Sequence, residues 1–348
     1  MSERRWTAAD FDYPLPEQLI AQIPLPARDG SRLLVVAADG TIRDSIFTDV
    51  TALIPPGDVV VVNSTRVRHA RLHATRRSGR PAEVLLIHPA GDDSWIAMGN
   101  PGRAMMPGKK LTLGEGVAIE TIEVLSDGTR RVRFIGATAD AAIIRFGKIP
   151  LPPYIVREPT AEDSHRYQTV YADRDGSVAA PTAGLHFTPE LLAALRQRGV
   201  TIAALDLEVG PGTFRPMDAG EVTAHPMHAE QFTIPEATAD AITAGRARGA
   251  RVWAIGTTVV RALESAARDD GTVTAGGAET RLMIAPGFRF RVADRLITNF
   301  HLPRSTLLML VAAFVGYDTV MAAYQHAIAA EYRFYSYGDA MCLTGHPA

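Results

Sequence analysis

Apolar and polar positions repeat with two different periods along the chain, which predicts both strands and helices. Four consecutive valines at 59–62 suit a strand buried on both faces, and the run at 33–36 predicts another strand. Helical spacing occurs at 188–199 and 237–249, and each of these segments leads into an apolar strand. We also expect a helix to start within residues 16–22. The pattern therefore favours an α/β fold.

The pattern changes between residues 68 and 152. Short alternating strands follow one another there, separated by Gly-Asp, Gly-Glu and Asp-Gly turns. Prolines at 150, 152 and 153 close this region, after which helices return. We therefore predict a large mixed α/β, sandwich-like domain formed by residues 1–67 and 153–348, with an all-β domain inserted at 68–152.

The stretch "TNFHLPRSTLLMLVAAF" places polar residues directly before an apolar run. The run Leu307–Val315 is far shorter than the ~20 apolar residues that span a bilayer, so it predicts a buried helix. Ser305 can cap its first turn, and Gly316 stands where a helix ends. The free N–H groups of such a start can bind an anion beside His301 and Arg304, or the junction is only a buried cap with a paired histidine.

Three further segments concentrate polar residues and glycines where predicted strands end, which is where α/β sheets bind ligands. Each has a simpler interpretation as a turn, and none has the full dinucleotide or P-loop spacing. The candidates in these segments are Thr182 and His186; Gly210, Gly212, Thr213 and Arg215; and Gly256, Thr257, Thr258, Arg261 and Glu264.

Two other polar clusters have competing interpretations. In "HPMHAEQF", His225, His228 and Glu230 could bind a metal, but Pro226 opposes a regular helix and no further ligand has diagnostic spacing, so we expect no metal. Near the C-terminus, aromatic residues interleaved with arginine could stack on bases or simply pack together.

Composition and charge narrow the possible classes of protein. The chain has 348 residues, 47% of them hydrophobic, which suits two domains with a real core. A net charge of -2 excludes a globally basic nucleic-acid binder but leaves a local basic patch possible. The single cysteine, Cys342, cannot form an internal disulfide or a cysteine-based zinc site, and the N-terminal region lacks an apolar signal-peptide core. We therefore expect a soluble, cytoplasmic protein without a membrane partner.

Several phrases together resemble one enzyme family. "VVNSTRVRHARL", "GSVAAPTAGLHFT", "VGPGTFRP", "HPMHAE", "AIGTTVVRALES", "TNFHLPRSTLLMLVAAF" and "YRFYSYGDAM" closely resemble the S-adenosylmethionine:tRNA ribosyltransferase-isomerases of queuosine biosynthesis. The resemblance runs from about Phe11 to Met341. It implies that the inserted domain is a small β-barrel.

The resemblance also implies a reaction. The ribosyl part of S-adenosylmethionine is transferred to 7-aminomethyl-7-deazaguanine at the wobble position of tRNA and isomerised, giving epoxyqueuosine-tRNA, adenine and methionine. The partners implied are this tRNA and S-adenosylmethionine, which is consumed as a co-substrate. No cofactor is expected, and we expect a monomer.

The implied reaction suggests roles for the candidate residues. The helix start at Thr257 and Thr258, with Arg261, would bind the methionine carboxylate, and Glu264 would pair with the amine. His186 or His228 would remove a C5′ proton, and His301 or Asn299 would help adenine to leave. Tyr335, Tyr337 and Asp339 would hold the deazaguanine. The remaining substrate-binding candidates are Thr182, Gly210, Gly212, Thr213, Arg215, Glu230, Gly256, Arg304 and Ser305.

Two positions depart from the family pattern, and other functions stay open. Glu208 stands where the family usually has histidine. Arg304 stands where lysine is common; arginine keeps the positive charge but makes a forked, two-bond contact where lysine makes a single one. One alternative is the same chemistry on a free deazapurine or another small amine. Another is a tRNA-binding protein without catalysis. Methyl transfer is a third, but no methyltransferase-type glycine-rich first strand supports it.

Overall fold

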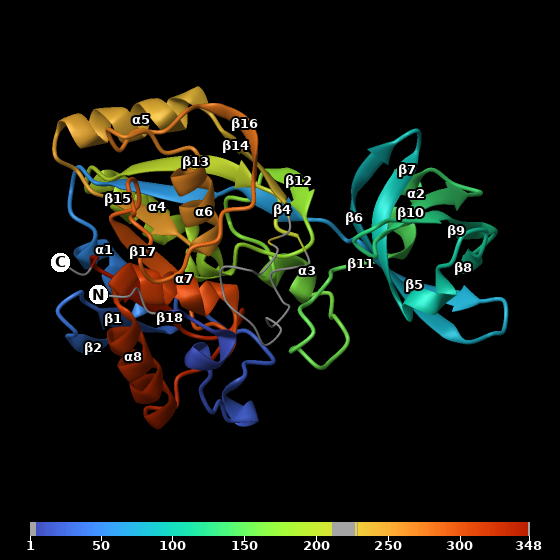
Figure 1. Ribbon diagram of the computed structural model, residues 1–348, viewed down its shortest axis with the longest axis horizontal. Coiled ribbons are helices and arrows are strands. Elements are labelled where there is room, and N and C mark those ends of the chain that lie inside the picture. Colours follow the sequence, from blue (N-terminus) through green and yellow to red (C-terminus); the bar gives the residue numbers. More distant parts are fainter. Residues whose placement is uncertain (1–4, 211–226, 228, 347–348) are drawn as a thin grey trace.

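The computed structural model describes residues 5–210, 227 and 229–346, which form a large α/β domain and a smaller β domain that projects from it (Figure 1). The large domain is built on a mixed sheet of nine strands. In spatial order these are β16 (Gly276–Thr280), β14 (Glu230–Ile234), β13 (Thr201–Leu207), β3 (Val59–Asn63), β15 (Val252–Ile255), β17 (Arg295–Asn299), β18 (Ala340–Leu343), β1 (Arg32–Val36) and β2 (Ile42–Ile46).

The four central strands β13, β3, β15 and β17 run parallel, so their carboxyl ends meet at one edge of the sheet. β18 runs antiparallel to β17, and its first residue, Ala340, pairs with Asn299 at the end of β17. The segment that precedes β18 therefore reaches the same edge. The polar residues predicted at strand ends are brought together by this topology.

Helices cover both faces of the large sheet. Alternate valines of β3 pack into different clusters, Val59 and Val61 on one face and Val60 and Val62 on the other, as expected for a strand buried on both sides. One face carries α5 (Glu236–Ala247), α6 (Thr257–Ser265), α7 (Thr306–Val315) and α8 (Tyr317–Ala329). The other face carries α1 (Val50–Leu53), α4 (Pro189–Gln197) and the 3-10 helix η5 (Thr182–His186). The predicted sandwich-like α/β fold is confirmed.

The second domain is a closed antiparallel barrel of six strands, also as predicted. The strand order is β5 (Arg71–Arg76), β6 (Pro81–Gly91), β7 (Ser94–Asn100), β10 (Arg130–Ile135), β9 (Val117–Val124) and β8 (Lys110–Gly114). Pairing of β5 with β8 closes the barrel, and β11 (Gly147–Lys148) adds to the outer side of β5. The helix α2 (Ala139–Phe146) packs against its core. Closure leaves no free edge among the six strands.

Short elements complete the described chain. β4 (Thr65–Val67) and β12 (Arg174–Ser177) pair in parallel beside the barrel. The others are α3 (Asp163–Arg166), η1 (Ala8–Phe11), η2 (Glu17–Leu19), η3 (Phe47–Asp49) and η4 (Gly102–Ala104).

The helix expected to start within 16–22 is only the single 3-10 turn η2. Directly after this turn the backbone forms a bridge between Ile20 and Phe334, with the N–H of Phe334 donating to the carbonyl of Leu19 at 2.8 Å. Hydrogen bonds to a distant segment therefore replace those that a longer helix would make, which is a tertiary effect invisible in local sequence.

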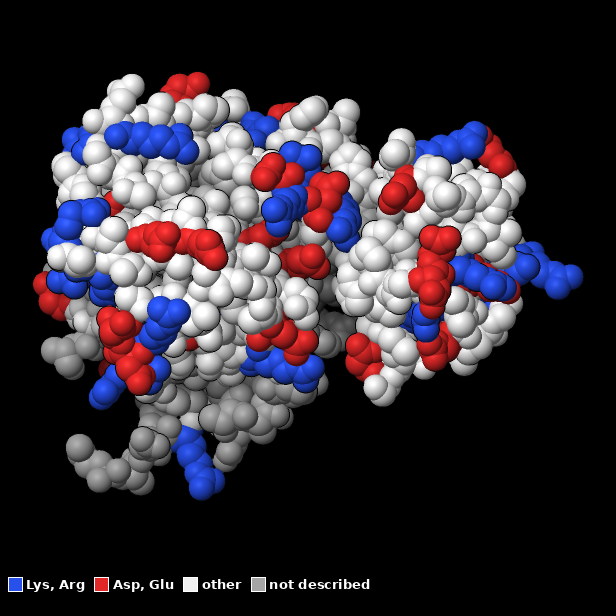
Figure 2. Space-filling view, turned by 90° about the horizontal axis from the view of Figure 1, so that it is seen from above, with Lys and Arg blue, Asp and Glu red and all other residues white. Residues whose placement is uncertain are grey.

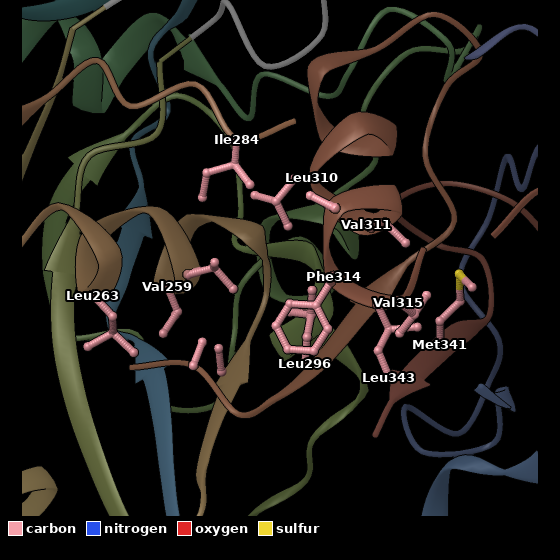
Figure 3. Packing of buried hydrophobic residues seen from close by; sticks show 14 of the residues in the cluster. Val259, Leu263, Ile284, Leu296, Leu310, Val311, Phe314, Val315, Met341 and Leu343 are labelled. Carbon is pink, nitrogen blue, oxygen red and sulfur yellow. The ribbon is translucent and has the colours of Figure 1, made fainter. Parts of the chain in front are cut away.

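The apolar run at 307–315 is the buried helix α7, as predicted. Figure 3 shows side chains of α6 and α7, including Val259, Leu263, Phe314 and Val315, pointing into one apolar cluster. Gly316, at φ +95°, ends α7, and α8 begins at the next residue. Among the described residues no single helix is long and apolar enough to cross a membrane. Only α7 and α8 counted together reach that composition, and they meet at 114°.

Candidate functional site

A pocket lies where the central parallel strands end. It is open to solvent. Its walls come from η5, the start of α6, the residues after β17, the start of α7 and the segment before β18. Eight of the predicted site residues line it: Thr182, Gly256, Thr257, Thr258, Asn299, His301, Ser305 and Tyr335.

The start of α6 points free backbone N–H groups at this pocket. Gly256 precedes the helix at φ +95°, a conformation that favours glycine, and its own N–H donates to the carbonyl of Ile297 at 2.8 Å. Glycine has no side chain to cap the helix, and no side-chain cap is formed. The first N–H groups of the nine-residue α6, together with its dipole, therefore form a place for an anion.

The start of α7 is already satisfied within the protein. The Ser305 hydroxyl accepts from the N–H of Leu308 at 3.2 Å and donates to the carbonyl of Leu302 at 2.8 Å. This confirms the predicted cap. Because the cap occupies one of the free N–H groups, α6 offers the better anion site of the two helix starts.

His186 lies behind the pocket wall and is fully engaged by neighbours. Its Nδ1 is 2.8 Å from the Ser31 hydroxyl, and its Nε2 is 3.0 Å from Nδ2 of Asn299. An amide nitrogen can only donate, so Nε2 is the acceptor and Nδ1 carries the proton toward Ser31. Burial, together with the positive charges of Arg28 and Arg333, lowers the pKa of His186 to about 3. His186 is a neutral, buried residue with both nitrogens bonded.

The surroundings of Asn299 fix the orientation of its amide. Nδ2 faces His186, the carbonyl of Tyr335 at 3.2 Å and the carbonyl of Asp339 at 3.5 Å, and all three accept hydrogen bonds. Oδ1 is buried and has no hydrogen-bond partner among the described residues. Because buried polar atoms are rarely left unpaired, Oδ1 is available for a hydrogen-bond donor on a ligand.

His301 lines the pocket itself. Its Nε2 is 2.9 Å from the Thr298 hydroxyl, and its backbone N–H donates to the Tyr324 hydroxyl at 2.9 Å. The Tyr13 hydroxyl donates to its carbonyl. Burial lowers the pKa of His301 to about 3, so the ring that lines the pocket is neutral near pH 7.

Two tyrosines also line the pocket. The rings of Tyr154 and Tyr335 have centroids 4.6 Å apart, and the Tyr154 hydroxyl is 2.6 Å from that of Ser336. Tyr335 holds a backbone φ of +72°, which is uncommon outside glycine. Burial raises the pKa of both phenols, so they stay protonated and present flat, neutral faces.

Three other predicted residues form internal contacts outside the pocket. Arg261 pairs with Glu230, and both are buried. Glu264 accepts from the backbone N–H groups of Arg291, Val292 and Ala293 at 2.9 to 3.0 Å. One buried guanidinium nitrogen of Arg261 has no partner among the described residues, but neither Arg261 nor Glu264 lines the pocket. The geometry therefore does not place them against a substrate zwitterion there.

Two of the C-terminal candidates, Asp339 and Tyr337, also form internal contacts. Asp339 accepts from the N–H groups of Arg32 and Arg333, and the Tyr337 hydroxyl donates to Asp163 at 2.8 Å. Of the aromatic residues near the C-terminus, Tyr335 lines the pocket. Tyr332, Phe334 and Tyr337 are buried and pack inside the protein, as the packing interpretation expects. The geometry thus does not support Tyr337 and Asp339 as contacts for a base.

Arg304 and Gly210 also lie outside the pocket lining. Arg304 is exposed, 3.6 Å from the carboxylate of Asp12, and its backbone N–H donates to the carbonyl of Phe11. Gly210 follows β13, and its N–H donates to Glu230 at 3.4 Å. Gly212, Thr213, Arg215 and His228 lie outside the described residues. Within the residues that are described, no cluster of three or more His, Cys, Asp or Glu could hold a metal.

Glu208 faces away from the pocket. Its neighbour Val209 lines the pocket, whereas Glu208 lies in a separate hollow beside Asp206. Burial and the charge of Asp206 raise its pKa, and Arg68 and His88 oppose the rise. The position that departs from the family pattern therefore does not line this pocket.

Four polar residues that line or support the pocket were not predicted. Tyr154, Thr298 and Ser336 line the pocket, and Ser31 holds His186. Thr298 adjoins a predicted residue in the sequence and could have been found that way. Ser31, at the start of a different strand, carries no local signal.

Comparisons with known proteins agree on one family. The family described as "Queuosine biosynthesis protein" matches residues 8–343. A protein of Dechloromonas aromatica named S-adenosylmethionine:tRNA ribosyltransferase-isomerase is 49% identical over 347 residues, covering 98% of each chain. One of the same name from Anaeromyxobacter is 50% identical over 341 residues, covering 97% of this chain and 98% of its own.

A solved structure is similar to this one as well. The crystal structure of S-adenosylmethionine tRNA ribosyltransferase from Thermotoga maritima matches with a TM-score of 0.56 and 37% identity. The match covers 96% of this chain and 99% of that one.

Proposed function

Because the chain belongs to the queuosine biosynthesis protein family and is a ribosyltransferase-isomerase of that family, we propose that it transfers and isomerises the ribosyl group of S-adenosylmethionine onto 7-aminomethyl-7-deazaguanine in tRNA. The acceptor is the wobble position, and the products are epoxyqueuosine-tRNA, adenine and methionine. One observation carries the proposal: an uncapped helix start and an unpaired buried amide oxygen line the same pocket.

The carboxylate of S-adenosylmethionine binds at the start of α6. The N–H groups after Gly256 supply hydrogen bonds, and the positive end of the helix dipole favours a negative charge. The predicted help from Arg261 is absent from this scheme because Arg261 is paired with Glu230.

Asn299 recognises a purine amino group in this scheme. Its Nδ2 is committed to three acceptors, so it cannot donate to departing adenine, as the sequence had suggested. Its Oδ1 instead accepts an N–H from the base in the pocket. His186 and Ser31 hold the amide in this orientation, which makes His186 a positioning residue.

The reaction breaks the bonds from ribose to adenine and to sulfur, and joins the ribosyl group to the aminomethyl nitrogen. Sulfur leaves as the neutral thioether of methionine and keeps the electron pair of its bond. Adenine leaves with the electron pair of its own bond and takes up one proton; of the two protons lost from C5′ and from the aminomethyl nitrogen, one is thus accounted for by adenine and the other passes to solvent. His301 offers a neutral ring nitrogen near the reacting groups, and Tyr335 and Tyr154 provide flat faces for a base. With His186 fully bonded, His228 is the remaining candidate for removal of the C5′ proton.

No separate cofactor enters this scheme, because S-adenosylmethionine is consumed. We also propose that a monomer acts on its tRNA. Chelation with EDTA should leave turnover unchanged, and loss of activity that zinc or magnesium restores would contradict the absence of a metal.

Product analysis tests the proposed acceptor. The protein is incubated with S-adenosylmethionine and either tRNA bearing 7-aminomethyl-7-deazaguanine or the free base, and adenine and methionine are quantified. We expect release with the modified tRNA only. Equal release with the free base would favour the small-amine alternative, and binding of S-adenosylmethionine without any release would favour a non-catalytic protein.

A further inference from the structure

The net charge of the chain conceals an uneven distribution between its two domains. Residues 68–152 contain 13 Lys and Arg against 8 Asp and Glu, whereas the rest of the chain contains 23 against 30. The barrel region is therefore formally +5 and the remainder -7. A cationic domain on an otherwise acidic protein attracts a polyanion to one place.

Part of this excess gathers around one hollow on the barrel. Pairing of β5 with β8 sets Arg76 opposite Leu111 and brings the β5–β6 turn beside the loop that leads into β8. In Figure 1 this turn lies at the end of the barrel away from the large domain. The residues that line the hollow include no Asp or Glu, and five are cationic: Arg76, Arg77, Arg103, Lys109 and Lys110.

Most of these cations lack a competing carboxylate. Arg77, Arg103 and Lys109 are exposed, and within the described ranges none of them forms an ion pair with an acidic side chain. Lys110 lies 4.0 Å from Glu120, but Arg133 binds the same carboxylate at 2.6 Å. Arg76 differs, because its guanidinium donates to the carbonyl of Pro81.

Cations elsewhere on the barrel are mostly neutralised. Arg131 lies near Asp92 and Glu123, each at 3.7 Å, and Lys148 lies 3.3 Å from Glu158. On the face shown in Figure 2, basic and acidic side chains are likewise interspersed over both domains. The hollow is thus distinguished by positive charge with no acidic residue in its lining.

We propose that Arg77, Arg103, Lys109 and Lys110 bind the phosphate backbone of the substrate tRNA at a distance from the reacting nucleotide. Flexible, exposed cations suit phosphates, whose recognition needs charge rather than base-specific geometry. The inference rests on the proposed function, because it takes tRNA as the binding partner. It assigns the barrel the task of holding the RNA while the large domain binds S-adenosylmethionine.

The test compares two variants of equal charge change. The first is R77Q/R103Q/K109Q/K110Q, and the control is R196Q/R198Q/R248Q/R289Q, which removes four exposed arginines of the large domain. Fluorescence anisotropy measures the affinity for an unmodified tRNA transcript at several salt concentrations. Turnover assays measure the KM for modified tRNA and for S-adenosylmethionine, and circular dichroism verifies folding.

We expect the barrel variant to bind the transcript roughly 10-fold or more weakly at 0.1 M salt, with a log-log salt slope shallower by about 3. Its KM for tRNA should rise, while the KM for S-adenosylmethionine and the kcat at saturating tRNA stay unchanged. Unchanged affinity and slope in a folded variant would overturn the inference, as would equal weakening by the control. Because anisotropy needs no turnover, failure of the proposed reaction would be seen separately, as absence of adenine release by the wild type.

Discussion

At the scale of single residues, the relation of His186 to Asn299 decides how the site is understood. A histidine in a polar loop is a natural candidate for a base, and the family resemblance suggests either His186 or His228 for that role. The structure instead gives both ring nitrogens to Ser31 and Asn299. A proton acceptor needs a free lone pair directed at the substrate, and His186 has none.

Replacement of His186 by Gln therefore tests positioning against catalysis. We expect turnover to fall by less than about 100-fold, the lower end for loss of a proton-transfer residue, because only the orientation of Asn299 is relaxed. The pH–rate profile should keep its shape. A loss of about 1,000-fold or more, with disappearance of one limb of the profile, would restore His186 as the base.

Replacement of Asn299 by Leu removes the unpaired acceptor and the donor to His186. We expect kcat/KM for S-adenosylmethionine to fall by roughly 10- to 100-fold, which corresponds to about 1–3 kcal/mol for a lost buried hydrogen bond. The matched control is N63L, which removes a buried amide that bonds only to backbone of Leu207 and Thr65. N63L should lower stability without a specific change in KM. Equal kinetic effects of the two variants would contradict the role of Asn299.

The two buried histidines also make stability depend on pH. Both have a pKa lowered to about 3 in the folded protein, against about 6.5 when unfolded. The unfolded chain therefore binds more protons between these values, so stability falls as the pH falls through 6.5. Chemical denaturation between pH 7.0 and 5.0 should show this loss, up to about 1.4 kcal/mol per pH unit for each histidine. H186Q should show a smaller slope, and an unchanged slope would contradict a neutral buried His186.

At the scale of secondary-structure elements, the proposed binding of S-adenosylmethionine depends on the start of α6. Gly256 at φ +95° sets the direction of the first N–H groups, and its lack of a side chain leaves them uncapped. Loops and helix starts of this kind are specified by local sequence, because glycine after an apolar strand and before a helical pattern signals them.

Gly256→Ala should disturb that helix start. An alanine has room there, since its nearest neighbour would be the Cβ of Ala183 at 3.6 Å, but the backbone conformation costs about 1–3 kcal/mol. We expect the KM for S-adenosylmethionine to rise about 10-fold. Gly249→Ala is the control, because Gly249 has φ +76° with open space around it and follows α5 away from the pocket. It should lose stability only, and equal KM values for both variants would remove α6 from the site.

Elements were largely predictable because their signals are local. The buried strand β3, the capped helices α4 and α7 and the strands of the inserted domain follow from periodicity and turn residues. The failure at η2 and the internal partners found for Arg261, Glu264, Tyr337 and Asp339 share one cause. Each depends on a partner far away in the sequence, such as Phe334 for η2 or Glu230 for Arg261.

At the scale of the whole molecule, the topology explains why distant motifs form one site. Parallel strands β15 and β17 end at the same edge, and antiparallel β18 starts there, so the segment before β18 also reaches that edge. The sequence indicated that strand ends would hold the site, but it could not show which side chains point inward. Glu208 illustrates this, since alternation along the chain directs it away while Val209 lines the pocket.

The central claim is that this protein transfers the ribosyl group, and label transfer tests it most directly. Two preparations of S-adenosylmethionine, labelled in the ribose or in the methyl group, are incubated with the protein and tRNA bearing 7-aminomethyl-7-deazaguanine. The account predicts that ribose label enters the tRNA with one adenine released per label, while methyl label leaves as methionine. Methyl label in the tRNA, with S-adenosylhomocysteine as the product, would contradict it.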